Sequence, residues 1–315
     1  MHDDHMKAAR IHAPCGPEGI VYEDAPRPEP KEGEVLIRMH AAGVNPADWQ
    51  VMSRDTPGRQ YPWVPGYDVS GVVEQGGSTE SGLRDGDAVY AMLPLTAGGA
   101  FAEYAVADAD QVCAAPSSVG YVEAASLPIV ALTAWQALFD AAQLMAGMRV
   151  LVHAAAGGVG HVAVQLAKWR GAYVIGTASA ANAEFLHGIG VDEALDYTAR
   201  RFEDAARDVD VVLDPFGGEN ASRSLFALAA GGILVSLKGI DPAVAASAEK
   251  AGVRAEYVLA RPDRSQLAEI ARLVDAGALR PHVQDVFELR EARRALESSK
   301  RGHTRGKIVL RPPGM

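Results

Sequence analysis

A glycine-rich segment near the middle of the chain has the residue types and spacing that bind a phosphate group. An apolar run leads into it and a helical pattern follows it, in the order Val152-His153-Ala154-Ala155-Ala156-Gly157-Gly158-Val159-Gly160. Glycine permits positive φ and close approach of the backbone, and the free N–H groups at a helix start attract an anion. We therefore predict a turn that binds a dinucleotide diphosphate through Ala156, Gly157, Gly158, Val159 and Gly160. A tight turn without a ligand is the alternative.

The spacing matches the pattern G-x-G-x-x-G with Ala155 in the first place, followed by Gly157 and Gly160. Alone, such a pattern is weak evidence. Its place between a strand and a helix, within a longer alternation of strands and helices, makes it specific for a nucleotide-binding sheet.

The next strand carries the information on which dinucleotide is bound. An NAD site usually ends this strand with an acidic residue that binds the ribose hydroxyls. Here the strand ends Gly176-Thr177-Ala178-Ser179, and Asn182 follows. We predict that Thr177, Ser179 and Asn182 contact the cofactor, which favours NADP, although no lysine or arginine lies in this turn. Later strands predict further cofactor contacts at their carboxyl ends, from Phe216, Gly217, Gly218, Leu237 and Gly239.

The elements that must position these residues fall into two kinds. Short strands separated by Gly and Pro predict a small β-rich barrel, and examples are residues 35–39, 69–73 and 88–91. From about Pro128 strands and helices alternate, which predicts a parallel α/β sheet covered on both faces. Its six expected strands are residues 150–152, 173–175, 194–195, 211–213, 233–235 and 257–259.

The end of the chain has a third pattern. We expect a helix near residues 265–276, then a loop, a second helix near 290–298 and a short strand at 308–310. We predict three segments: residues 1–125 as the first part of a β-rich domain, 126–262 as the nucleotide-binding domain, and 263–315 as a return to the β-rich domain. Periodicity alone does not decide that return.

Composition limits the possible partners. Among 315 residues, 30 Lys and Arg stand against 40 Asp and Glu, and the net charge of −10 argues against nucleic acid and anionic membranes. The two cysteines are too few for a disulfide framework and indicate a reducing compartment. No signal peptide or membrane-spanning run of about 18 apolar residues is recognisable, so we expect a cytoplasmic protein.

Several motifs in order resemble the medium-chain dehydrogenase/reductase superfamily, and within it the zinc-lacking quinone oxidoreductases related to zeta-crystallin. The resemblance runs from Met6 to Pro312. It rests on the glycine-rich segment and on Ala41-Ala42-Gly43-Val44-Asn45-Pro46-Ala47-Asp48, Asp214-Pro215-Phe216-Gly217-Gly218 and Thr304-Arg305-Gly306-Lys307-Ile308-Val309. It implies a GroES-like catalytic domain built from both chain ends, an inserted Rossmann domain that binds NADP(H), and a homodimer or homotetramer, often formed by edge-to-edge pairing of Rossmann sheets.

The same resemblance argues against a metal. Zinc-dependent relatives hold catalytic zinc through two cysteines and a histidine, and the matching positions here are Asn45, Tyr67 and Ile129. None is a good zinc ligand. The cysteine-rich structural lobe is missing too. Without a Lewis acid, hydride addition to a quinone or an electron-poor C=C bond is favoured over alcohol oxidation.

The resemblance also implies roles for single residues. Asn45 matches an asparagine beside the nicotinamide that donates a hydrogen bond to a substrate oxygen, and an Asx-type turn before Pro46 is the alternative. Asp48 is expected to support the site through a charge contact, and acid–base work is the alternative. Thr133 matches a threonine that faces the cofactor, or it is a buried helix hydroxyl. From residue type alone, Tyr61 and Tyr67 are expected to donate a proton, to shape the pocket or only to pack, and solvent is another proton source.

Two further positions complete the expected cofactor site. Tyr197 matches a residue that contacts the adenosine part of NADPH, while Asn182 stands where the family has a lysine for the 2′-phosphate. Lys307 is expected to reach the cofactor from the catalytic domain, and a surface lysine is the alternative.

These observations predict a zinc-independent, NADPH-dependent oxidoreductase that passes a hydride to a quinone or an α,β-unsaturated carbonyl compound. One alternative is a non-enzymatic NADPH-binding protein, crystallin-like or RNA-binding, although the acidic balance argues against RNA. A zinc alcohol dehydrogenase is the remaining alternative.

Overall fold

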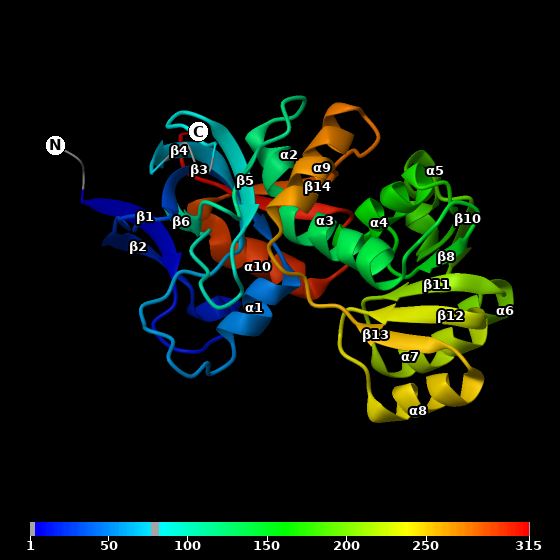
Figure 1. Ribbon diagram of the computed structural model, residues 1–315. Helices are drawn as coiled ribbons and strands as arrows, with labels where there is room; N and C mark the ends of the chain where they lie inside the picture. The colour runs from blue at the N-terminus through cyan, green and yellow to red at the C-terminus, as the bar shows by residue number, and fades with distance from the viewer. Residues whose placement is uncertain (1–3, 77–81, 315) are drawn as a thin grey trace. The chain divides into compact units, whose positions relative to one another are not determined.

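The computed structural model describes residues 4–76 and 82–314 (Figure 1). The chain divides into two compact units. The first unit comprises Met1–Leu132, Arg261–Gly277 and Pro281–Met315, and the second comprises Thr133–Ala260 and Ala278–Arg280.

The first unit is built on a mostly antiparallel seven-stranded sheet in the order β14-β15-β3-β4-β5-β7, with β6 paired to β3. A separate hairpin joins β1 (His5–Arg10) and β2 (Val21–Pro26). The strands of the large sheet are β3 (Glu34–Val44), β4 (Asp68–Gln75), β5 (Ala88–Met92), β6 (Tyr104–Asp108), β7 (Cys113–Ala114), β14 (Val283–Glu288) and β15 (Lys307–Arg311). Both ends of the chain therefore contribute to one sheet, because β15 pairs antiparallel with β3.

Short helices surround this sheet. They are α1 (Pro46–Met52), α2 (Tyr121–Ala125), α9 (Arg264–Asp275) and α10 (Ala292–Arg301), with 3-10 turns η1 (Pro17–Gly19) and η5 (Leu289–Glu291). Helix α10, red-orange in Figure 1, lies against α1. Its apolar face, with Ala292, Ala295 and Leu296, is buried in the core of this unit.

The second unit is a six-stranded parallel sheet in the order β10-β9-β8-β11-β12-β13. Read from its first strand this order is 3-2-1-4-5-6, that of a doubly wound dinucleotide-binding fold. The predicted α/β sheet is confirmed. The strands are β8 (Arg149–Val152), β9 (Tyr173–Ala178), β10 (Glu193–Asp196), β11 (Val209–Asp214), β12 (Leu228–Ser236) and β13 (Arg254–Tyr257).

Helices follow most of these strands. Figure 1 shows α5 (Ala183–Gly188) beside β10 at one edge of the sheet and α8 (Pro242–Ala251) beside β13 at the other. The remaining helical elements of this unit are α4 (Gly158–Trp169), α6 (Phe202–Ala205), α7 (Gly218–Ser224), η3 (Ala180–Asn182) and η4 (Leu225–Ala227). The expected helix after Pro128 is present as α3 (Pro128–Trp135), and it continues as one π-helical segment, η2 (Gln136–Ala141).

Two strand predictions were wrong in detail. The sixth strand of the parallel sheet spans Arg254–Tyr257, whereas residues 257–259 were expected, because the polar residues of this edge strand hid its pattern. The expected loop before residue 290 contains β14. This strand alternates partly buried and exposed positions and carries Asp285 and Glu288, so its sequence lacks an apolar run.

Candidate functional site

A buried polar cluster in the first unit surrounds the junction of β3 and α1. Asn45 is the N-cap of α1, with extended backbone angles, and Pro46 occupies the first helical position, where its missing N–H costs nothing. The backbone N–H of Asn45 donates to Asp48 Oδ2 at 2.6 Å. Asn45 is only 2% exposed, so this helix start is an interior feature.

Asp68, the first residue of β4, ties the cluster together. Its Oδ2 accepts a hydrogen bond from Asn45 Nδ2 at 2.8 Å, and its Oδ1 accepts one from the Ile129 backbone N–H at 2.7 Å. Gly43 makes room for it, since a Cβ there would lie 2.6 Å from Asp68 Oδ2. Asp68 was not predicted from the sequence, where its signal is a carboxylate at the start of a buried apolar strand.

Lys307 enters the same cluster from β15. Its ammonium donates to the Val44 carbonyl oxygen at 2.9 Å, to Asn45 Oδ1, and to Asp68 Oδ2 at 3.3 Å. The residue is 3% exposed. The alternative of a surface lysine is therefore wrong, while its predicted contact with the cofactor stays a prediction.

Asp48 and Tyr67 also belong to the cluster, and each has a buried polar atom without a hydrogen-bond partner among the described residues. Both residues are fully buried, and the two atoms are Asp48 Oδ1 and the Tyr67 hydroxyl oxygen. Burial raises the pKa of Asp48 to about 8, against opposing effects of the Asn45 N–H and Lys307. Burial, and then the Asp48 charge, raises the pKa of Tyr67 as well. At neutral pH both groups therefore hold their protons, so, contrary to expectation, Asp48 does not support the cluster through its charge, because burial keeps its carboxyl neutral.

Tyr61 and Thr133 were predicted catalytic residues. The Tyr61 hydroxyl is buried and has no hydrogen-bond partner within the described part of the chain. Its ring packs against the core of the first unit. Thr133 is 7% exposed and lies on α3 at the start of the second unit. The roles of both residues remain predictions.

The glycine-rich turn of the second unit joins β8 to α4 as predicted. Positive φ was one expected reason for the glycines in this turn, and that expectation was wrong. Gly157, Gly158 and Gly160 all have negative φ, whereas Ala154 adopts φ 49°. Gly160 is needed for close approach, because a Cβ there would lie 2.2 Å from the Ala154 carbonyl oxygen. Gly157 caps α4, so the N–H groups of its first turn lack helical acceptors.

The end of β9 lies beside this turn, since Ala155 N–H donates to the Thr177 carbonyl oxygen at 2.9 Å. Thr177 points inward, with its hydroxyl 3.2 Å from His153 Nδ1. Burial lowers the pKa of His153 to about 4, so this histidine is neutral and structural. Asn182 Nδ2 donates to Ser179 Oγ at 3.3 Å, and both side chains are partly exposed.

Other predicted cofactor residues share the same carboxyl edge of the sheet. Tyr197 follows β10 and is 52% exposed, and its N–H donates to the Ala178 carbonyl oxygen. Leu237 follows β12, and its N–H donates to the Asp214 carbonyl oxygen. Beyond β11 and β12 lies a hollow of about 570 Å³. Its lining residues are Phe216, Gly217, Gly218, Lys238, Gly239, Ile240 and Asp241. Lys238 was not singled out from the sequence.

Asp214 fixes the turn that carries three lining residues of that hollow, Phe216, Gly217 and Gly218. Its buried carboxylate accepts hydrogen bonds from the N–H groups of Phe216 and Gly217, both at 3.0 Å, and from Asn220 Nδ2 at 2.9 Å. The segment Asp214–Gly218 is thus an Asx-type turn that leads into α7. The aspartate fixes the turn, and the ring of Phe216, 58% exposed, faces outward.

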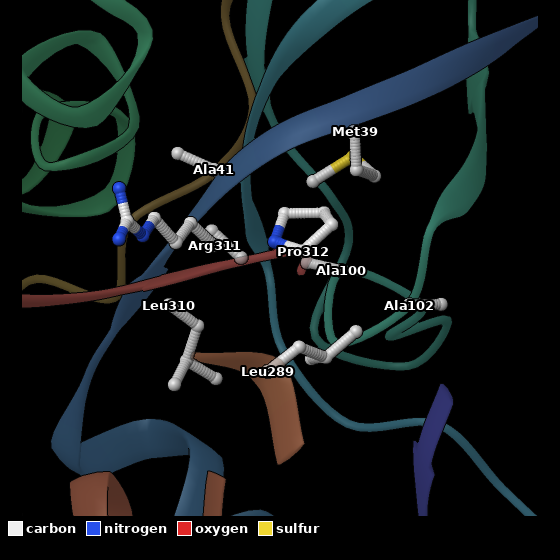
Figure 2. Close-up of a pocket in the computed structure, with 9 residues that line it drawn as sticks. Met39, Ala41, Ala100, Ala102, Leu289, Leu310, Arg311 and Pro312 are labelled. Atoms are coloured by element: carbon white, nitrogen blue, oxygen red, sulfur yellow. The ribbon is translucent and has the colours of Figure 1, made fainter. Parts of the chain in front are cut away.

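A second crevice, in the first unit, is unrelated to these residues. Figure 2 shows it where the end of β15 meets the interior of β3 at Met39 and Ala41, with Leu289, Leu310 and Pro312 around it. It has no room for a water molecule, and no predicted site residue lines it.

Comparison with known proteins identifies the family. The family described as alcohol dehydrogenase GroES-like domain matches residues 31–117, and the one described as zinc-binding dehydrogenase matches 189–310. The chloroplast envelope quinone oxidoreductase homolog of Arabidopsis thaliana is 34% identical over 313 residues, covering 94% of this chain and 95% of that protein. The chain belongs to the quinone oxidoreductase-like family of the medium-chain dehydrogenases/reductases.

Solved structures agree with this membership. The quinone oxidoreductase from Coxiella burnetii has a TM-score of 0.90 at 34% identity, covering 98% of this chain and 99% of that one. A mycobacterial protein complexed with NADPH has a TM-score of 0.88 at 30% identity, covering 98% and 100%. The predicted GroES-like and Rossmann architecture is thereby confirmed, and the chain is an NAD(P)H-dependent, quinone oxidoreductase-like enzyme.

Within residues 4–76 and 82–314, no three His, Cys, Asp or Glu side chains are grouped to hold a metal ion. In the same ranges, no helix combines the length and apolar character needed to cross a bilayer.

Proposed function

We propose that the protein is a zinc-independent, NADPH-dependent oxidoreductase that transfers a hydride to a quinone or an α,β-unsaturated carbonyl compound. The observation that carries this proposal is the state of the Asn45 amide. The amide oxygen accepts a hydrogen bond from Lys307, and one amide N–H donates a hydrogen bond to Asp68. The second amide N–H is therefore left to donate to a substrate oxygen.

The residues of the second unit fit the diphosphate of NADPH. The turn at Gly160 is too tight for any side chain, and the first N–H groups of α4 supply donors. Strand β9 itself ends without an acidic residue, and Ser179 and Asn182 offer polar groups there to a 2′-phosphate. Asp196 of β10 pairs with Ala178 beside them, and its carboxylate accepts hydrogen bonds from the N–H and the hydroxyl of Thr198. These features support NADPH over NADH.

In the reaction, bound NADPH supplies the hydride. The chain's own part is to stabilise the negative charge that then builds on the acceptor oxygen, and we propose that the free N–H of Asn45 donates to it. Asp48 and Tyr67 hold protons in the same cluster and supply a route for protonation of the enolate or hydroquinone oxygen. Burial of the cluster limits competing protonation by water.

The donor set at the positions matching the zinc ligands supports metal independence. Asn45 has its amide engaged, the side chain of Ile129 has no donor atom, and Tyr67 keeps its proton. The alternative, a zinc alcohol dehydrogenase, predicts stoichiometric zinc in the purified protein and loss of activity with a chelator.

The test follows NADPH oxidation at 340 nm with 1,4-benzoquinone, 9,10-phenanthrenequinone and an alkenal as acceptors. We expect turnover that a chelator does not reduce. NADPH binding without turnover of any acceptor would instead support a non-enzymatic role. Failure to bind either NADPH or NADH would remove the basis of the whole proposal.

We also propose a homodimer or homotetramer formed through β13, the edge strand of the parallel sheet, which bears the exposed Tyr257 and is followed by exposed Leu259. The cytoplasmic location remains a prediction from composition. Relatives named chloroplastic or mitochondrial leave a reducing organelle as the other candidate.

A further inference from the structure

Lys307 is the cation that hydrogen-bonds to Asn45 and Asp68 in the buried polar cluster, and all of its hydrogens are engaged. An ammonium has three N–H bonds, and the structure supplies three acceptors: the carbonyl oxygen of Val44, Asn45 Oδ1 and Asp68 Oδ2. A lysine that is 3% exposed loses most of its hydration. These three contacts replace it, so the ammonium is fixed in position.

The fixed ammonium determines how the Asn45 amide is oriented. With the oxygen toward Lys307 and the nitrogen toward Asp68, both contacts are attractive. A flipped amide would place its NH₂ group against the ammonium, so that two donors face each other. It would also place its oxygen against the Asp68 carboxylate, so that two acceptors face each other, and both contacts are repulsive. Lys307 and Asp68 together therefore allow only one orientation, with the second N–H of Asn45 held in a defined direction.

The ammonium also changes the strength of that donor. A cation bonded to an amide oxygen draws electron density away from the amide nitrogen, and chained hydrogen bonds in a low-dielectric interior reinforce each other. The remaining N–H of Asn45 becomes more acidic and binds a developing oxyanion more tightly than a neutral oxygen.

We infer that Lys307 is a positioning residue for the reaction: as a built-in cation it orients and polarises the Asn45 amide, through which its charge acts on the acceptor oxygen. This inference rests on the proposed function. Asp68 completes the device by holding the ammonium and the amide in place. Its two oxygens take one backbone and two side-chain hydrogen bonds, so this carboxylate is engaged within the cluster.

The charge balance dictates which variants are informative. Lys307→Met alone leaves the Asp68 carboxylate buried without a cation, and such a variant is at risk of not folding. The double variant K307M/D68N removes both charges together and keeps a side-chain amide for Ile129 and Asn45 to contact. Lys307→Arg keeps the cation.

The main experiment compares wild type, K307M/D68N, K307R and N45A for NADPH affinity, kcat and KM with 1,4-benzoquinone. For K307M/D68N we expect a KM for quinone within about threefold of wild type and a kcat about ten- to a hundredfold lower, which is less than the roughly 10²–10³-fold cost of removing an oxyanion donor outright. A loss of NADPH affinity with unchanged kcat would instead show that Lys307 contacts the cofactor and would overturn the positioning role. K307R should recover part of kcat. Unchanged kcat in K307M/D68N would overturn the inference.

A second comparison tests whether the charge acts through Asn45. In an N45A background, K307M/D68N should reduce kcat by less than about threefold, because the group that transmits the charge is already absent. A full additional ten- to a hundredfold loss in that background would show that Lys307 acts on the reaction by another route. Should wild type itself fail to consume NADPH with any acceptor, the proposed function fails first.

A measurement on wild type covers the case in which the variants do not fold. Lysine ammonium groups in water exchange their hydrogens too fast to be seen by NMR near neutral pH, whereas one held by three acceptors exchanges slowly. Protein labelled with ¹⁵N-lysine should show one persistent ammonium signal at pH 7, coupled by NOE to the Asn45 side-chain amide. No such signal would mean that the ammonium is not held as described.

Discussion

At the residue scale, Asp48 has the chemistry furthest from that of an ordinary surface carboxyl. Its Oδ2 accepts one backbone hydrogen bond, its Oδ1 has no partner within the described residues, and the nearby ammonium is engaged elsewhere. The carboxyl groups of Asp48 and Asp68 therefore lie near the same ammonium group. Asp68 accepts a hydrogen bond from that ammonium. Asp48 stays protonated, because burial raises its pKa to about 8.

The pKa of Asp48 makes the stability of the protein depend on pH. The unfolded chain releases this proton near pH 3.8 and the folded protein near pH 8, so the folded state loses stability as the pH rises between these values. Asp48→Asn removes the ionisation while keeping an oxygen for the Asn45 N–H. As the pH rises across this range, we expect the free energy of unfolding of the variant to increase relative to that of wild type by up to about 1.4 kcal/mol per pH unit.

Urea unfolding of both proteins at pH 5, 6, 7 and 8 measures this effect. Asp55→Asn, which removes an exposed carboxylate just beyond α1, is the matched control and should show no such trend. A stability difference between D48N and wild type that does not grow with pH would mean that Asp48 is already ionised in the folded protein.

Ser179 provides the residue-scale test of cofactor choice. At the end of β9 an acidic side chain would repel a 2′-phosphate and bind ribose hydroxyls instead. Ser179→Asp should raise the KM for NADPH by about tenfold or more and lower that for NADH. Steady-state kinetics with both cofactors measures the change. Ser222→Asp, an exposed serine on α7, should leave the ratio unchanged, and an unaltered ratio in S179D would exclude this contact.

At the scale of elements, the join between β8 and α4 depends on one glycine. In Gly160→Ala the added methyl would meet the Ala154 carbonyl oxygen at 2.2 Å, and backbone has to move to relieve it. We expect a loss of about 1–3 kcal/mol of stability and weaker NADPH binding, since the N–H groups of α4 shift with the turn.

Gly188→Ala is the matched control. It is also a helical glycine, in α5, but its added methyl meets nothing within 4 Å. It should leave the stability unchanged or raise it by about 0.5–1 kcal/mol, and NADPH affinity should not change. Thermal melting and fluorescence titration with NADPH separate the two variants. Equal behaviour of both would mean that the turn tolerates a side chain.

The parallel sheet could be predicted because its strands are continuous apolar runs with helices between them. Strands β8, β9 and β11 are buried on both faces, and each was found at the expected place. The edges β13 and β14 carry charged residues and lack that signal, so one was misplaced and the other missed. Pairing between distant segments also has no local signature: nothing in Lys307–Arg311 indicates that β15 pairs with β3.

The same limit applies to the candidate site. Asn45 and Lys307 stand in segments with recognisable residue patterns, so both could be named in advance. Asp68 could not, because its importance comes from three contacts with residues 23, 61 and 239 positions away in the chain. A buried aspartate is visible in a sequence only as one carboxylate beside an apolar strand.

At the scale of the whole molecule, the open question is how copies of the chain associate. Strand β13 pairs only with β12 among the described strands, so its other edge presents unpaired backbone groups. Tyr257 and Leu259, 49% and 60% exposed, add apolar surface at that edge. Such an edge would bind further protein indiscriminately unless a defined partner covers it, and a second β13 related by a twofold axis is a self-complementary partner.

Leu259→Lys tests this arrangement. In a dimer formed through this edge, each copy would bury a lysine where wild type buries an apolar side chain, so we expect the dissociation constant to rise by about tenfold or more. Light scattering after size exclusion should give a multiple of 33.2 kDa for wild type and a mass that falls toward 33.2 kDa on dilution of the variant. Phe226→Lys, at an apolar residue 69% exposed on η4, should not change the mass. If wild type itself runs at 33.2 kDa, or if only F226K dissociates, β13 is not the contact and its edge must be protected in another way.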